Sequence, residues 1–277
     1  MKRSVLLAAL SAATVALTLL AMSASSVAAG TLPTLTLALT KNTVTVGGSE
    51  VSGAVNIVAT ATGEKSDAPG LILLKPGVSP AAFGKAISHF GPSTALDAID
   101  PYGSIVFDGS ATEGTPTSVE TWLQPGTYVA TETGSGFATF TVAPSTAPAT
   151  LPPPGAEVDA IDFGFRGASV LHDGELVRFK NDGYLIHMFL FVGAKSVADA
   201  KLAEQALEAG KCTGGGQCRK YSTGVKGGFA GPLSHAELQQ EVINEPPGVY
   251  VIYCAMNAED GREHFQLGMF KTITIAK

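Results

Sequence analysis

The stretch from Glu245 to Lys277 reads EPPGVYVIYCAMNAEDGREHFQLGMFKTITIAK and decides how the fold is interpreted. It contains two short β-type runs, VYVIY and KTITI, with a polar, turn-forming segment between them. Cys254 ends the first run, His264 follows after nine intervening residues, and Met269 comes after four more. Because a loop between two strands presents its side chains from a rigid scaffold, we expect these three side chains to lie close together.

A fourth candidate, His187, lies upstream in VRFKNDGYLIHMFLF. A thiolate, two imidazoles and a thioether form the donor set of an electron-transfer copper centre. The sequence therefore predicts that His187, Cys254, His264 and Met269 bind one copper ion. Taken singly, each of these residues is more often an ordinary core residue, and that alternative stays open.

The first 29 residues have the pattern of a signal peptide. Lys2 and Arg3 precede an apolar run from Val5 to about Met22, and small residues end at Ala29. A membrane anchor is the alternative, because the run approaches membrane-spanning length. We expect a secreted or periplasmic protein with no membrane association beyond the signal peptide.

Charge and methionine usage narrow the choice of partner and metal. The chain has 18 basic and 24 acidic residues, and without Lys2 and Arg3 the net charge is −8, which argues against nucleic acid or anionic membranes as partners. After residue 29 the methionines are Met188, Met256 and Met269, each within two residues of a predicted ligand or itself one. Thioethers favour copper over zinc.

The three cysteines form an odd number, which needs a reason in an exported protein. Cys212 and Cys218, in CTGGGQC, are predicted to form a local disulfide, since an oxidising compartment permits one. Cys254 is then unpaired, either as a metal ligand or as a buried thiol packed like a hydrophobic side chain. Pairing of Cys254 with one of the other two cysteines is a third alternative.

Short β-type runs broken by Gly, Pro and Ser predict an all-β fold. The Pro-rich segment 146–155 is predicted to be a linker between domains at 30–145 and 156–277. Both halves contain Pro-Gly-x-Tyr-Val, in LQPGTYVATE and EPPGVYVIYC. We therefore expect two tandem β-sandwich domains.

The internal repeat also locates the site. Aligned on the shared motif, Cys254 falls on Glu132 and His187 falls near Gly70, and no His or Met follows Glu132 in that segment. The sequence therefore predicts a metal site in the second half alone. Helices are expected at 79–87 and 196–210, and a third is expected to begin at Ser234.

Residues 156–277 resemble the cupredoxin family, the blue copper proteins related to plastocyanin. The resemblance lies in VRFKN followed by His187 and in the Gly-x-Tyr strand before Cys254. It also lies in the four residues, ending in Gly268, that separate His264 from Met269. It implies Greek-key sandwiches, the second with a helical insert, and the copper ligands named above. Residues 31–145 look like a degenerate copy without ligands. The exposed edge of His264 is the expected electron exit.

The resulting functional prediction is a secreted, mononuclear, type 1-like copper protein for one-electron transfer or copper carriage. Its expected partner is a redox or copper-exchange protein. The sequence has five histidines, too few for the trinuclear cluster of multicopper oxidases, so we expect no catalytic turnover. Three of these, His89, His172 and His235, are expected to be structural or exposed. A secreted β-sandwich interaction module that binds no metal is the alternative.

Overall fold

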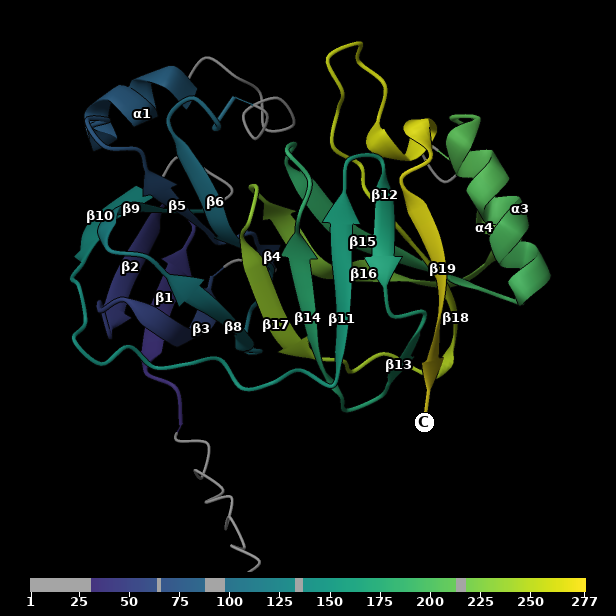
Figure 1. The fold of residues 1–277 in the computed structure, drawn as a ribbon, viewed down its shortest axis with the longest axis horizontal. Helices are drawn as coiled ribbons and strands as arrows, with labels where there is room; N and C mark the ends of the chain where they lie inside the picture. The colour runs from purple at the N-terminus through teal and green to yellow at the C-terminus, as the bar shows by residue number, and fades with distance from the viewer. Residues whose placement is uncertain (1–30, 64–65, 88–97, 133–136, 213–217) are drawn as a thin grey trace, which may run out of the picture. The chain divides into compact units, whose positions relative to one another are not determined.

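β-Strands dominate the computed structural model, which describes residues 31–63, 66–87, 98–132, 137–212 and 218–277 (Figure 1). The all-β prediction is confirmed. The predicted signal peptide and His89 lie outside the described residues. In the part of the chain that is described, no helix is both long enough and apolar enough to span a membrane.

The first half of the chain contains ten strands and one helix within the described residues. They are β1 Thr34–Thr40, β2 Thr43–Gly48, β3 Gly53–Thr62, β4 Ser66–Asp67, β5 Gly70–Leu74, α1 Pro80–Ile87, β6 Gly103–Asp108, β7 Ala111–Thr112, β8 Thr117–Leu123, β9 Gly126–Thr131 and β10 Phe137–Val142.

The second half repeats the strand pattern and adds helices. Its elements are β11 Ala156–Ile161, β12 Gly164–Gly167, β13 Val170–His172, β14 Leu176–Asn181, β15 His187–Ala194, α3 Val197–Glu208, α4 Cys218–Tyr221, β16 Ser222–Leu233, β17 Leu238–Val242, β18 Gly248–Tyr253, η2 His264–Leu267 and β19 Phe270–Ala276.

The sheet pairings show that the two halves are structural repeats. One eight-stranded sheet has the order β12-β11-β14-β17-β8-β3-β1-β2, so each half contributes four strands in mirrored order. In each half, the strands that come first and third along the chain pair in parallel in this sheet: β1 with β3, and β11 with β14. The opposing sheets are β10-β9-β5-β6 and β13-β19-β18-β15-β16. As the sequence repeat predicts, Glu132 and Cys254 directly follow the equivalent strands β9 and β18.

The halves meet where β17 pairs antiparallel with β8, at Gln240 and Glu120. The Gln240 Nε2 donates to Glu120 Oε2 at 3.0 Å, and the Thr121 hydroxyl donates to the Leu238 carbonyl at 2.6 Å. The segment 146–155 has no strand and hydrogen-bonds to β3, where Ala54 N donates to Ala149 O at 2.9 Å. A domain boundary within this segment stays a prediction.

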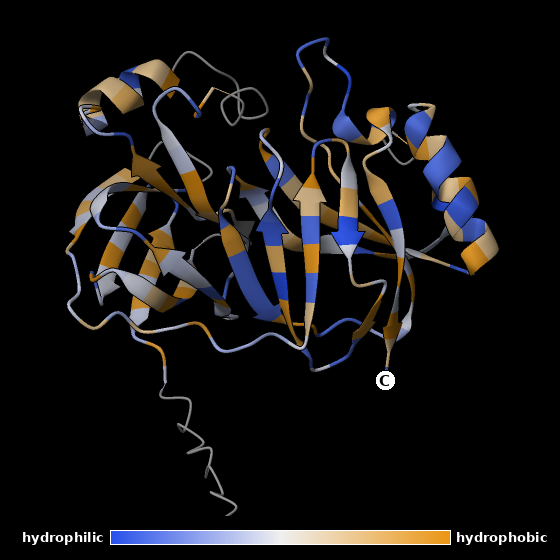
Figure 2. Cartoon of the chain, in the orientation of Figure 1, coloured by the Kyte–Doolittle hydropathy of each residue, from blue (hydrophilic) through white to orange (hydrophobic). Residues whose placement is uncertain are grey.

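Two hydrophobic cores fill the space between the facing sheets. Alternating side chains build them: in β1 and in β14 every second residue is buried. Figure 2 shows the bands of hydrophobic and hydrophilic residues along the strands. The second core is rich in stacked aromatic rings, with Phe179 on Phe229 at 5.1 Å and Phe191 on Phe229 at 4.4 Å between ring centroids. Cys254, Met256 and Met269 belong to this second core.

The helix predictions at 79–87 and 196–210 are confirmed by α1 and α3, and α3 has Ser196 as its N-cap, accepting from Asp199 N. The prediction of a helix at Ser234 is wrong. Ser234 N donates to Ile105 O at 3.0 Å, and Ser234 Oγ accepts from Ile105 N at 2.9 Å. The Ser234 side chain that would cap a helix is therefore bonded to the first half of the chain. The backbone then turns at Ala236, which has a φ of 67°.

Burial of Glu237 gives the fold a testable pH dependence. The side chain is 8% exposed, and burial raises its pKa to about 7 from 4.5. Between these values the folded state keeps a proton that the unfolded state has lost, so the free energy of unfolding falls as pH rises. We expect the Glu237→Gln variant to lose less stability between about pH 5 and about pH 8 than the wild type, by at most about 3 kcal/mol. Denaturant unfolding at the two pH values measures this difference. The exposed Glu259→Gln variant is the control, and an equal slope in wild type and Glu237→Gln would contradict the prediction.

Candidate metal centre

Neighbouring strand ends bring the predicted ligands to one end of the second sandwich. His187 is the first residue of β15, and Cys254 directly follows β18, which pairs antiparallel with β15. His264 begins η2, and Met269 directly precedes β19, the other neighbour of β18. Because antiparallel neighbours begin and end side by side, all four positions come together.

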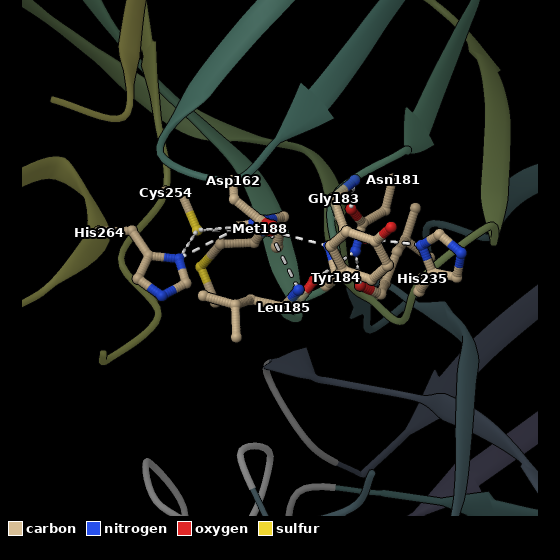
Figure 3. A network of polar contacts seen from close by, with 11 residues as sticks. Asp162, Asn181, Gly183, Tyr184, Leu185, Met188, His235, Cys254 and His264 are labelled. Carbon is tan, nitrogen blue, oxygen red and sulfur yellow. Dashed lines mark hydrogen bonds and ion pairs between the residues drawn. The ribbon is translucent and has the colours of Figure 1, made fainter. Parts of the chain in front are cut away.

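Three donor atoms converge in this arrangement (Figure 3). The two Nδ1 atoms of His187 and His264 are 3.2 Å apart, and Cys254 Sγ lies 3.8 Å from the first and 3.4 Å from the second. All three side chains are at most 1% exposed. Within the described residues, His187, Cys254 and His264 are the cluster of metal-ligating side chains whose donor atoms lie within 4.8 Å of one another.

These separations fit one central metal ion. Metal distances of about 2.0 Å to nitrogen and about 2.3 Å to sulfur, at tetrahedral angles, place two nitrogens about 3.3 Å apart and nitrogen and sulfur about 3.5 Å apart. The donor atoms are therefore spaced for an ion between them. The strand repeat supplies the sandwich, and the ligand cluster lies at its end. Residues 156–277 thus have the strand repeat and the ligand cluster that the resemblance to cupredoxins implies.

The sequence matches no protein-family model and no curated protein. Among solved structures, this chain is similar to dithionite-reduced auracyanin from the photosynthetic bacterium Roseiflexus castenholzii, at 20% identity over 44% of this chain and 95% of that one, with a TM-score of 0.26. Auracyanin A, a "blue" copper protein from Chloroflexus aurantiacus, is 18% identical over 43% of this chain and 95% of that one, with a TM-score of 0.26.

A copper nitrite reductase from Nitrosomonas europaea is 11% identical over 88% of this chain and 93% of that one, with a TM-score of 0.22. At these TM-scores the three likenesses carry no argument about the site. Its interpretation rests on the donor geometry.

Backbone hydrogen bonds hold the loop that carries Cys254, His264 and Met269 in place. Cys254 N donates to Met269 O at 3.2 Å, and Met269 N donates to His264 O at 3.1 Å, so the backbone of Met269 joins those of both ligands. The Met269 side chain is fully buried. Met188 N donates to Cys254 Sγ at 3.4 Å, which orients the sulfur and stabilises a thiolate.

The nine-residue gap between Cys254 and His264 folds back on itself. Asn257 bridges to Glu263, Ala258 N donates to Arg262 O at 2.8 Å, and His264 N donates to Met256 O at 2.8 Å. The extra residues therefore form a small hairpin that returns the chain to the site, and they leave His264 beside Cys254.

Both imidazoles are held neutral by their surroundings. Burial lowers the pKa of His187, partly offset by Asp162, and burial together with the neighbouring His187 lowers the pKa of His264 to about 4. His187 Nε2 lies 3.1 Å from Asp162 Oδ1 and donates to it, which leaves Nδ1 with a free lone pair. Neutral imidazoles with Nδ1 directed at a cysteine sulfur are the form that binds a metal.

The prediction that one edge of His264 is exposed to solvent is wrong. The side chain is 1% exposed, and the Phe163 ring covers it edge-on, with 5.3 Å between ring centroids. Within the described residues His264 Nε2 is buried without a hydrogen-bond partner. Phe163 adopts a φ of 60°, which is unusual for a bulky residue, so the turn that carries the ring over the site is itself strained.

The loop before His187 is fixed by residues that the sequence patterns did not single out. Gly183 packs so closely that an added Cβ would lie 2.6 Å from Asp162 Oδ1 and 2.7 Å from His187 Nε2. His235 is not part of the ligand cluster. Its Nδ1 donates to Gly183 O at 2.7 Å, and its ring stacks on Tyr184. These contacts fix the backbone that leads into His187.

The remaining cysteines are paired as predicted. Cys212 and Cys218 form a disulfide in the helical insert, and Cys254 is a buried cysteine outside that disulfide. His172 lies beside the turn at Gly174 and is largely exposed, with its Nδ1 3.5 Å from Glu175 Oε2. It takes no part in the cluster.

Proposed function

We propose that the chain is a secreted mononuclear copper protein, in which His187, Cys254 and His264 hold one copper ion and Met269 is the weak fourth ligand. The observation that supports this is the convergence of three buried donor atoms within 4.8 Å of one another. A bound metal ion would offset the desolvation of two imidazoles and a thiol that are buried in the hydrophobic core.

A bound copper ion would supply a one-electron couple, and the protein's part is to hold the ligands still. Phe265 N donates to Cys254 O at 2.9 Å and Met188 N donates to its sulfur, while His187 is fixed through Asp162. Ligands fixed by backbone bonds rearrange little when the charge at the site changes. This rigidity suits one-electron transfer, and copper carriage by the same site is a close variant.

Copper is the proposed metal because the surroundings are rich in soft sulfur. Met256 and Met269 are buried in the core that contains Cys254, and Met188 packs against the same core. Thioethers suit copper better than zinc, which is satisfied by thiolate and imidazole alone. The signal-peptide pattern of residues 1–29 supports secretion, and the expected partner is a redox or copper-exchange protein without catalytic turnover in this chain.

Titration of the purified protein with Cu(II) tests this proposal. We expect one tightly bound ion per chain and an intense thiolate-to-copper absorption band near the red end of the visible spectrum. A mild reductant should bleach the band, and reoxidation should restore it. A protein that stays colourless and binds no copper stoichiometrically would favour the non-metal interaction module instead.

A further inference from the structure

The turn between β11 and β12 delivers a carboxylate to one ligand of the proposed copper site. Ile161 pairs with Gly164, so Asp162 and Phe163 are the two residues of the turn. Asp162 contacts His187, and Phe163 covers His264. One short turn, in the sequence IDFG, therefore contacts both imidazoles from outside the strands that carry them.

A single oxygen of Asp162 is the acceptor for three donors (Figure 3). Asp162 Oδ1 accepts from Tyr184 N at 2.9 Å, from Leu185 N at 3.1 Å and from His187 Nε2 at 3.1 Å. A carboxylate oxygen that accepts from three N–H groups has its negative charge stabilised by all three. Asp162 therefore places a negative charge next to the ligand ring.

The two imidazoles differ in whether their Nε2 atom has a hydrogen-bond partner. His187 Nε2 donates to a carboxylate, whereas His264 Nε2 has no hydrogen-bond partner within the described part of the chain. The close packing of Gly183 against both Asp162 Oδ1 and His187 Nε2 leaves no room for a side chain between them. The contact between carboxylate and imidazole is thus built into the fold and specific to one ligand.

We propose that Asp162 is a positioning residue that fixes His187 with its proton on Nε2 and biases the site towards the oxidised, doubly charged metal. The proposal rests on the copper-binding function above. A carboxylate that accepts a proton from a ligating imidazole raises the basicity of the ring, and its negative charge stabilises the more highly charged ion more strongly.

The variant Asp162→Asn removes the charge and keeps the shape, because an amide oxygen can still accept from the Tyr184 and Leu185 amides. We expect its affinity for Cu(II) to fall about tenfold relative to its affinity for Cu(I), since loss of such contacts costs about 10–100-fold. A tenfold change in this ratio corresponds to a reduction potential about 59 mV higher. Both affinities and the potential should be measured.

Asp182→Asn is the matched control. Asp182 lies in the same loop region, and its carboxylate contacts Arg166 and Lys180 instead of a histidine. Equal losses of Cu(I) and Cu(II) affinity in Asp162→Asn, or the same shift in Asp182→Asn, would overturn the proposal.

A measurement on the metal-free protein separates this proposal from the proposed function. Histidine ¹⁵N shifts should show His187 protonated on Nε2 in the wild type, and a mixture of tautomers in Asp162→Ala. If the protein binds no copper but Asp162 controls the tautomer, the copper function fails while the positioning role of Asp162 stands. If Asp162→Ala leaves the tautomer unchanged, the positioning role is overturned whether or not copper binds.

Discussion

Replacing Cys254 with serine is expected to abolish the intense copper absorption band and most of the copper affinity. Cys254 Sγ lies 3.4 Å and 3.8 Å from the two imidazole Nδ1 atoms, so it is the one thiolate available to the site in the described structure. Loss of a direct ligand should cost more than the roughly 10–100-fold that loss of an outer contact costs. Absorption spectra and competitive copper titrations measure both effects.

Serine is nearly isosteric with cysteine, so the fold should survive and Met188 N keeps an acceptor. The matched control replaces Cys212 and Cys218 together, which removes two sulfurs from the helical insert and leaves the band unchanged. A coloured complex of normal affinity in the Cys254→Ser protein would show that the ligands of the copper are elsewhere.

Replacing Asn181 with alanine is expected to lower stability and loosen the site together. Asn181 is fully buried, and its Nδ2 donates to Leu185 O and Leu233 O at 2.7 Å each, while its Oδ1 accepts from Gly183 N at 2.9 Å. Alanine removes all three bonds, and each buried backbone group that loses its partner costs about 1–3 kcal/mol, whereas Gly183 N keeps its bond to Ala160 O at 3.1 Å. We expect a loss of about 3 kcal/mol, and a melting temperature lower by roughly 6–12 °C.

The same bonds hold the loop whose amides donate to Asp162, so copper affinity should fall as well. Thermal unfolding of the metal-free protein and copper titration of the variant measure the two effects independently. The exposed Asn244→Ala variant is the control. An Asn181→Ala protein with an unchanged melting temperature would contradict this account of the loop.

The repeat and the cluster of His187, Cys254 and His264 were predictable from sequence because both depend on local signals. Pro-Gly-x-Tyr-Val marks a turn and a strand in each half, and both copies form the expected strands, β9 and β18. The odd number of cysteines led to Cys254, and its donor atom meets those of His187 and His264 in the structure. His187 and Cys254 are 67 positions apart in sequence, and they meet because they lie at neighbouring ends of the paired strands β15 and β18.

Other features depend on tertiary contacts and leave no local signal. Asp162 stands in an ordinary hairpin turn, and its role appears only when Tyr184, Leu185 and His187 are brought against it. Ser234 resembles a helix cap, but bonds to Ile105 from the other half use its polar groups. The burial of His264 likewise depends on Phe163, which lies about a hundred residues away in sequence.

The junction between β17 and β8 also has a consequence for aggregation. Each strand ends the four-stranded portion that its own half contributes to the shared sheet, and each covers the unpaired edge of the other. An uncovered edge strand is a template for pairing with another chain. The first half therefore protects the half that contains the ligand cluster against self-association. Residues 156–277 produced alone would expose β17 as an edge open to intermolecular pairing.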